Sequence, residues 1–127
     1  MSIIFGSVTI NRNPSVDSKW HNERLNQYTE ETADGGRVTY DNGPTITKGT
    51  IIIRNVAKTE ADNLATYLTG TAIYGKNSMT IDPPANTDLG AGAGTAITAY
   101  YDGGNTLEGV FQMITATLYN INFPYKY

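Results

Sequence analysis

Hydrophobic residues in this chain mostly follow the two-residue alternation of β-strands. Residues 2–10 are rich in β-branched and aromatic side chains, with Ile4, Val8 and Ile10 on one parity, so they predict an opening strand. Residues 37–41 alternate apolar and polar positions between a Gly-Gly pair and an Asn-Gly-Pro sequence, a pattern that predicts a strand between two turns. Both patterns favour a β-protein.

Four further strands are expected. Residues 49–56, GTIIIRNV, contain three consecutive isoleucines, which predicts a strand covered on both faces. Residues 72–74 and 78–81 flank a GKN sequence, which reads as a hairpin turn, and residues 95–101 form a strand that ends at a DGGN turn. Between them, residues 82–94 form a loop by composition.

The last predicted strand is long, covering residues 106–123. Its apolar residues change parity between Met113 and Ile114, which indicates a β-bulge or the passage of the strand into a second sheet. The chain ends in the aromatic sequence FPYKY, so we expect a docked C-terminus.

One segment, at about residues 59–69, carries the helical period instead. Its apolar positions follow the spacing i, i+3, i+4 and i+7: Ala61, Leu64, Ala65 and Leu68. Thr59 is a candidate N-cap with Asp62 three residues later, and Gly70 stands where a glycine would end the helix. A helix of about a dozen residues is marginal alone, so the stripe must pack on a sheet or close the end of a sandwich.

Residues 15–34 are polar, with Trp20, Leu25 and Tyr28 as isolated large residues. Two interpretations stay open: a second strand followed by a long loop, or an extended arm that packs on a neighbouring subunit. Loops longer than about 12–15 residues in compact domains are usually functional or disordered, so this segment is of special interest.

These elements predict a mainly β fold, an antiparallel β-sandwich or barrel with one flanking α-helix. A chain of 127 residues and 13.8 kDa is most economically one domain. We therefore expect residues 1–127 to form a single β-sandwich domain with a long polar arm or loop at about residues 15–34.

The surface is expected to be polar but weakly charged. Charged residues make up 17% of the chain, below the roughly 25% of average domains. Such a surface suits burial against other copies or partners, and it also occurs in ordinary β-sandwiches. The net charge of -3 and the absence of adjacent Lys or Arg residues argue against specific nucleic-acid binding.

No apolar stretch approaches the roughly 18 residues that span a bilayer, and the N-terminal sequence lacks the features of a signal peptide. We therefore expect that the protein does not insert into a membrane and that it assembles in a cytoplasm. The chain contains no cysteine, which excludes disulfides and thiolate metal sites.

Candidate chemistry is sparse. His21 is the one histidine, and Glu30 and Glu31 are adjacent, so in a strand they point to opposite faces. The glycines of GAGAG at residues 90–94 lack the spacing and the following helix of a dinucleotide site, which favours a flexible loop. The sequence thus predicts no catalytic, cofactor-binding or metal-binding residue, and no enzyme.

Aromatic residues leave two interpretations. The nine tyrosines, with Trp20, would suit a sugar-binding face, because aromatic rings offer flat apolar surface with a polar handle. They would equally suit the core and subunit interfaces, which is the interpretation that we favour.

The order of elements resembles that of small tail-tube and baseplate-hub proteins of bacteriophages. The resemblance covers roughly residues 35–123 and rests on GGRVTYDNGP, GTIIIRNV, TEADNLATYL and the closing QMITATLYNINF. It implies a β-sandwich with one flanking helix that forms rings around a tail axis, and it carries no active-site residues.

If the resemblance holds, the protein is a structural virion protein of a phage tail or baseplate. Its expected partners are other copies of itself, in a ring-forming homo-oligomer, and other tail or baseplate proteins. The helix would present Glu60, Asn63 and Thr66 outward, while strand edges and the arm pair with neighbours. The alternative is a carbohydrate-binding β-sandwich module that uses exposed aromatic residues.

Overall fold

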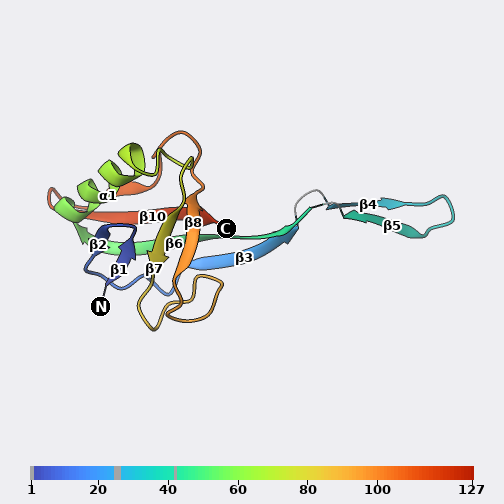
Figure 1. The fold of residues 1–127 in the computed structure, drawn as a ribbon, viewed down its shortest axis with the longest axis horizontal. Coiled ribbons are helices and arrows are strands. Elements are labelled where there is room, and N and C mark those ends of the chain that lie inside the picture. The colour runs from blue at the N-terminus through green and yellow to red at the C-terminus, as the bar shows by residue number, and fades with distance from the viewer. Residues whose placement is uncertain (1, 25–26, 42) are drawn as a thin grey trace.

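The computed structural model describes residues 2–24, 27–41 and 43–127. These residues form a mainly β structure with antiparallel pairing and one helix among them, which confirms the predicted fold class (Figure 1). The elements are β1 (Ile3–Phe5), β2 (Val8–Ile10), β3 (Lys19–Arg24), β4 (Gln27–Glu31), β5 (Arg37–Asp41), β6 (Thr45–Ala57), α1 (Lys58–Gly70), β7 (Met79–Asp82), β8 (Ile97–Tyr101), β9 (Phe111–Met113) and β10 (Leu118–Lys126).

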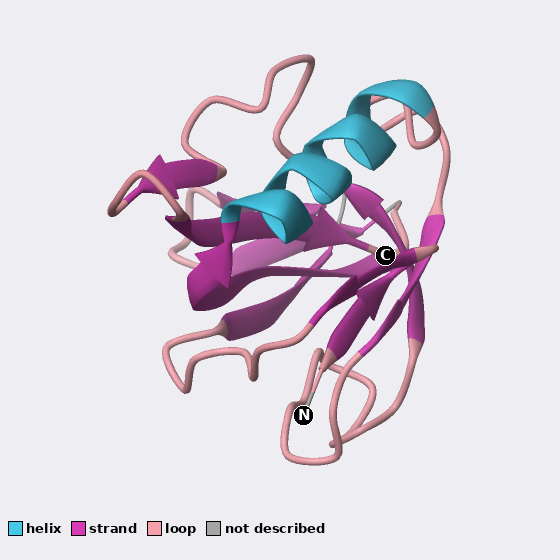
Figure 2. Ribbon diagram, turned by 90° about the vertical axis from the view of Figure 1, so that its left-hand side faces the viewer, coloured by secondary structure: helices cyan, strands magenta, loops and turns pink. Residues whose placement is uncertain are grey.

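Strand β8 belongs to two halves of the main sheet. Its first residues pair with β7, and its last two, Tyr100 and Tyr101, pair with Lys126 and Tyr125 of β10. The strand order on one side is β2-β1-β7-β8, and on the other side it continues through β10 and β6 to β3, with β9 also paired to β10. The sheet therefore turns at β8, and its two halves face each other as a sandwich (Figure 2).

The core lies between these two halves. Phe5 of β1 and Phe123 of β10 meet with ring centroids 4.8 Å apart, and Tyr101 of β8 lies 5.7 Å from Phe123. The largest fully buried side chains come from both halves, the helix and one loop: Ile3, Phe5, Ile10, Ile51, Ile53, Leu64, Leu68, Ile81, Leu89, Tyr101, Phe123 and Tyr125.

The isoleucine run of β6 is covered completely on one face. Ile51 and Ile53 are fully buried, whereas Ile52 between them is only half-buried. The prediction of a strand covered on both faces is therefore wrong. This alternation is typical of a sheet with one face on the core and one face toward solvent.

Helix α1 packs on the sandwich through its predicted stripe. Ala61, Leu64 and Leu68 are buried, and Ala65 is half-buried. The helix touches β2 of one half and β6 and β10 of the other, so it closes the side of the core between them (Figure 2). Burial of this stripe stabilises a helix that would be marginal in isolation.

The ends and the outer face of α1 differ from the sequence prediction. The N-cap residue is Ala57, without a side-chain cap, and Thr59 lies inside the helix, so the capping prediction is wrong. Asp62 instead accepts a hydrogen bond from Lys58 at 3.1 Å. On the face predicted to point outward, Asn63 and Thr66 are exposed, but Glu60 is half-buried and accepts two hydrogen bonds from Asn11.

The predicted opening strand is a hairpin. Phe5 pairs with Val8 across a two-residue turn, and Gly6 in this turn has a φ of 60°, which glycine adopts without strain. The turn changes the parity of the core-facing residues, so the prediction is wrong for Ile4, whereas Val8 packs against the core and Ile10 is buried. The fully buried residues of this hairpin are Ile3, Phe5 and Ile10.

Two other predicted strands are divided or lost. Residues 72–74 form a turn, in which Ile73 and Tyr74 have φ values of 47° and 57°. The segment 106–123 contains β9, a turn at residues 114–117 and the start of β10. The parity change at Met113 and Ile114 therefore marks a hairpin turn and not a bulge.

The C-terminus is docked, as predicted. Strand β10 continues to Lys126, and the backbone of Tyr127 exchanges two hydrogen bonds with Thr47 at 2.7 and 2.9 Å. Residues 83–96 form a loop apart from one isolated bridge between Asp88 and Ala93.

Candidate assembly surface

A β-hairpin formed by β4 and β5 projects from the body of the protein; we call residues 27–41 the arm (Figure 1). Its ladder follows the ladder between β3 and β6. The β3–β6 ladder runs from Lys19 opposite Thr50 to Arg24 opposite Thr45. The ladder of the arm then joins β4 to β5 over five residue pairs. Strands β3 and β6 thus carry the arm outward along the long axis of the molecule.

The arm ends in a tight, locally bonded turn. The amide of Gly35 donates to the carbonyl of Thr32 at 3.0 Å, and the amide of Thr32 donates to the carbonyl of Gly36 at 2.9 Å. Gly35 has a φ of 87°, as expected for a three-residue hairpin loop that ends in a left-handed residue. Asp34 accepts hydrogen bonds from the Thr32 hydroxyl and the Gly36 amide, and these bonds lower the pKa of its carboxyl group. The tip therefore has a defined shape of its own.

The two faces of the arm differ chemically. Glu31 lies opposite Arg37 and Thr29 opposite Thr39, where the two threonine hydroxyls are 3.1 Å apart. These four residues share one face, which carries one acidic and one basic side chain opposite each other. The other face carries Glu30 opposite Val38.

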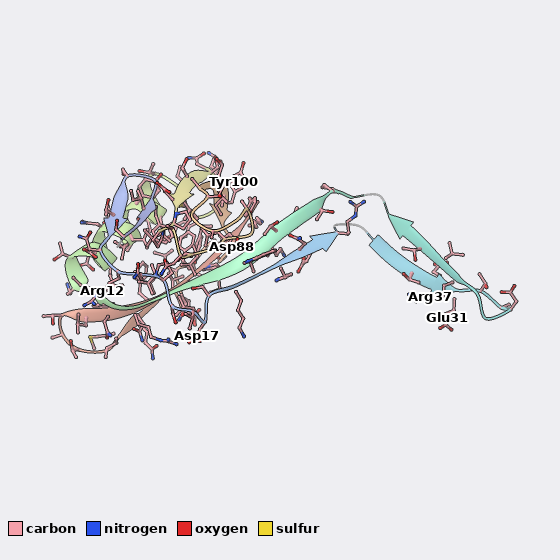
Figure 3. All side chains as sticks on the ribbon, turned by 90° about the horizontal axis from the view of Figure 1, so that it is seen from below. Arg12, Asp17, Glu31, Arg37, Asp88 and Tyr100 are labelled. Atoms are coloured by element: carbon pink, nitrogen blue, oxygen red, sulfur yellow. The ribbon has the colours of Figure 1, made fainter. Side chains whose placement is uncertain are left out.

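Among residues 29–39 of the arm, no side chain is buried. Every residue from 29 to 39 is exposed, and the exposed fraction of Val38 is 39%. Figure 3 shows Glu31 and Arg37 near the tip, far from Tyr100 and Asp88 on the body. An isolated two-stranded hairpin is at best marginally stable in water.

The segment 15–34 was expected to be a strand followed by a loop, or an arm. It contains β3 and β4, so the long loop is wrong, and the arm continues through β5 to Asp41. Leu25, one of its isolated large residues, and Asn42, in the predicted Asn-Gly-Pro turn, lie outside the described residues.

The outer face of the β3-β6-β10-β8 sheet half carries a basic row. His21, Lys48, Lys126 and Tyr100 lie opposite one another in successive strands. Directly opposite residues of paired strands project to the same face, so these four side chains form one row across the sheet. The His21 ring lies 2.7 Å from the Glu23 carboxylate, and this hydrogen bond lowers the Glu23 pKa.

A pocket of about 330 Å³ lies on this outer face. Another pocket, of about 360 Å³, lies between β2 and α1. The outer-face pocket is lined by Ile46, Lys48, Tyr100, Lys126 and Tyr127. Tyr100 is 40% exposed and Ile46 is half-buried. This pocket therefore combines apolar and aromatic lining residues with two lysines.

Trp20 lies on the opposite face of the same sheet half. It is in register with Gly49, which is in turn in register with the buried Tyr125. Trp20 therefore shares no aromatic platform with Tyr100, whose row projects outward. It borders a separate pocket of about 330 Å³ together with Pro14, Ser15, Val16, Ser18, Asn86, Thr87 and Asp88.

Most described tyrosine side chains serve packing. Tyr101 and Tyr125 are buried, and four others are half-buried: Tyr67, Tyr74, Tyr119 and Tyr127. The hydroxyls of Tyr125 and Tyr127 both donate to the carbonyl of Leu89, at 2.9 and 3.1 Å. These bonds fix the loop that precedes the GAGAG sequence.

The glycine-rich loop binds its own carboxylate. One oxygen of Asp88 accepts hydrogen bonds from the amides of Gly90 and Gly92 at 2.7 and 3.1 Å. The amides of Gly90 and Gly92 are therefore bonded within the chain and do not form an open anion-binding loop.

The described residues contain no group of three or more His, Cys, Asp or Glu side chains that could hold a metal ion. No helix of the described residues is long and apolar enough to cross a membrane. Comparison of the chain with protein families, curated proteins and solved structures finds no match. The geometry of the arm and the sheet faces is thus the basis for a functional argument.

Proposed function

We propose that this protein is a non-enzymatic structural subunit of a bacteriophage tail. It forms or joins a ring in the tail tube or baseplate hub, through contacts with other copies of itself and with other tail or baseplate proteins. Assembly occurs in the host cytoplasm and the protein remains in the virion. The observation that carries this proposal is the projecting arm, because it is a regular hairpin whose residues 29–39 are all exposed.

The arm gains little stability from burial of its own described side chains. Ordering a residue costs about 1–2 kcal/mol of backbone entropy, and burial of apolar surface is the usual compensation. The arm buries no side chain among residues 29–39. A neighbouring subunit supplies the missing burial, and the arm then supplies the contact that holds the two subunits together.

Strand edges support the same proposal. Strand β3 ends the strand order of its sheet half, and no described strand pairs with its outer edge. A free edge of six residues is an aggregation hazard unless it is covered or used. In a ring, such an edge becomes part of a repeated head-to-tail interface.

The test is replacement of residues 25–44 by Asn-Gly. Arg24 and Thr45 are in register, so a two-residue turn of this type closes β3 directly onto β6. Light scattering over a wide concentration range and negative-stain microscopy would compare this armless variant with the complete chain. We expect rings or tubes from the complete chain and folded monomers from the armless variant.

Either of two results would refute the proposal. One is an armless variant that assembles as the complete chain does. The other is a complete chain that stays monomeric at every concentration and does not bind tail proteins of a phage that encodes it. Circular dichroism of the armless variant checks that the β-sandwich itself is retained.

A second candidate function is carbohydrate binding at the pocket beside Trp20. The half-exposed indole ring lies next to the side chains of Asn86 and Asp88, a combination that suits the apolar face and the hydroxyls of a sugar ring. A glycan array tests it directly. Binding that is lost in Trp20→Ala and retained in the armless variant would favour this function over assembly.

A further inference from the structure

The outer-face pocket is lined by apolar, aromatic and basic side chains. It is lined by Ile46 of β6 and Tyr100 of β8 together with Lys48, Lys126 and Tyr127. Tyr100 and Ile46 remain accessible, although apolar side chains gain about 25 cal/mol for each Å² removed from water. A group that fills this pocket should therefore be apolar in the middle and acidic at its side.

Lys48 and Lys126 can each donate a hydrogen bond to a further acceptor. Lys48 lies 3.5 Å from the Glu23 carboxylate, and Lys126 lies 3.5 Å from the Asp102 carboxylate. These distances exceed the 2.7–2.9 Å that is typical of a charge-assisted hydrogen bond. An ammonium group has three donors, and both lysine side chains are partly exposed, so each can donate a hydrogen bond to an additional carboxylate.

One face of the arm has the matching chemistry. Val38 is apolar and 39% exposed, and Glu30 stands directly opposite it in the register. Among the described residues, Glu30 has no ion-pair partner, whereas Glu31 on the other face lies opposite Arg37. The Val38 face thus presents an uncompensated acid beside an apolar side chain.

The arm cannot satisfy the pocket of its own chain. It extends from the body along β3 and β6, and its tip lies far from Tyr100 (Figures 1 and 3). The complement must therefore come from another molecule, and a second copy of this chain carries it.

We propose that the Val38 face of the arm docks into the outer-face pocket of a second copy. Val38 packs on Ile46 and Tyr100, and Glu30 lies between Lys48 and Lys126. The donor and acceptor surfaces are different, so the contact is head-to-tail and repeats from copy to copy. This inference rests on the proposed function, since it names the surface that receives the arm.

Cysteine cross-linking tests the contact, because the chain has no cysteine of its own. Val38→Cys protein is mixed with Tyr100→Cys protein, or with Ile46→Cys protein, under mild oxidation. We expect a mixed disulfide dimer in at least one of these mixtures. Thr39→Cys is the matched control: it lies next to Val38 on the opposite face of the arm, and it should give at most a weak cross-link.

Charge exchange tests the ionic part of the contact. Glu30→Lys and Lys126→Glu should each raise the concentration needed for assembly by about tenfold, the effect of losing roughly 1.4 kcal/mol. The double variant should restore assembly toward the level of the unchanged chain. Arg12→Glu is the control for Lys126→Glu, because Arg12 is exposed and lies away from Tyr100 (Figure 3).

The outcomes separate this inference from the proposed function. If the armless variant fails to assemble but the charge variants assemble normally and no mixed disulfide forms, the arm docks elsewhere and the inference is overturned. If the armless variant assembles normally, the proposed function fails and this inference fails with it. Restored assembly in the double variant, together with the Val38 cross-link, would support both.

Discussion

Gly49 gives the sharpest test of how the sandwich is packed. It lies in β6 between Trp20 of β3 and Tyr125 of β10, and it lets the Tyr125 ring cross the strand to reach the Leu89 carbonyl. A Cβ at Gly49 would lie 2.6 Å from the Lys19 carbonyl oxygen and 2.6 Å from the Tyr125 hydroxyl oxygen. We therefore expect Gly49→Ala to be strongly destabilising.

The magnitude follows from the geometry. Ordinary contact begins at 3.4 Å, so both oxygens must move by roughly 0.8 Å, and one of them belongs to the backbone of a paired strand. Overpacking of this kind costs about 1–3 kcal/mol. Displacement of Tyr125 also weakens its hydrogen bond to Leu89, at about 0.5–1.5 kcal/mol. The smaller entropy of the unfolded alanine chain offsets about 0.4–1 kcal/mol. The net loss is about 0.5–4 kcal/mol.

The assay is urea denaturation followed by circular dichroism and by the fluorescence of the single tryptophan. It should be run at two protein concentrations, because assembly makes apparent stability concentration-dependent. Gly70→Ala is the matched control, since a Cβ at Gly70 meets nothing within 4 Å, and it should be neutral or stabilising. If Gly49→Ala unfolds within about 0.5 kcal/mol of the unchanged chain, Tyr125 does not occupy the space over Gly49 and the packing argument is refuted.

Two further predictions concern the same core. Leu64→Ala should lower the free energy of unfolding by about 2–5 kcal/mol in urea denaturation, because Leu64 is fully buried between α1 and the sheet; a loss below 1 kcal/mol would contradict this packing. Burial raises the pKa of Tyr101 and Tyr125, so above pH about 10 the unfolded chain loses these protons first and stability falls as pH rises, by up to about 1.4 kcal/mol per pH unit for each group. Tyr125→Phe should make the decline measured by denaturation between pH 9 and 11 shallower, and an unchanged slope would contradict this assignment.

Local signals in the sequence were sufficient for the helix and for several strands. The stripe of Ala61, Leu64 and Leu68 is complete within one segment, and the packing of α1 follows it. The β-branched run around Ile51 likewise identifies the central strand β6. Such signals depend on residues close in sequence, and a single chain displays them fully.

Hairpin turns without a strong sequence signature were the main source of error. The pair Gly6-Ser7 turns the chain inside what reads as one strand, and residues 114–117 do the same before β10. Neither turn contains the Asn-Gly or Asp-Gly pair that identifies a two-residue hairpin from sequence. A missed turn changes the parity of every residue after it, which explains the wrong buried set near Ile4.

The shape of the arm could not be predicted from local sequence patterns. Its polar composition was visible, but its shape depends on pairing of β4 with β5 and of β3 with β6, whose residues are up to 31 positions apart at Lys19 and Thr50. The pocket that we assign to the arm depends on Ile46 and Tyr100, which lie on strands separated by α1 and β7. No local period in the sequence brings these residues together.

Strand β6 gives the arm a mechanical connection to the whole body. It extends from Thr45, at the base of the arm, to Ala57, with one register shift in its pairing with β10 between Tyr119 and Ile121, and α1 begins at the next residue. A force that pulls on a docked arm would act along β6 in shear, against its ladders with β3 and β10. Hydrogen bonds loaded in shear share the tension and do not open one after another. In a series of subunits joined in this way, the pulling force would pass through the β6 strands, and the helices would bear little of it.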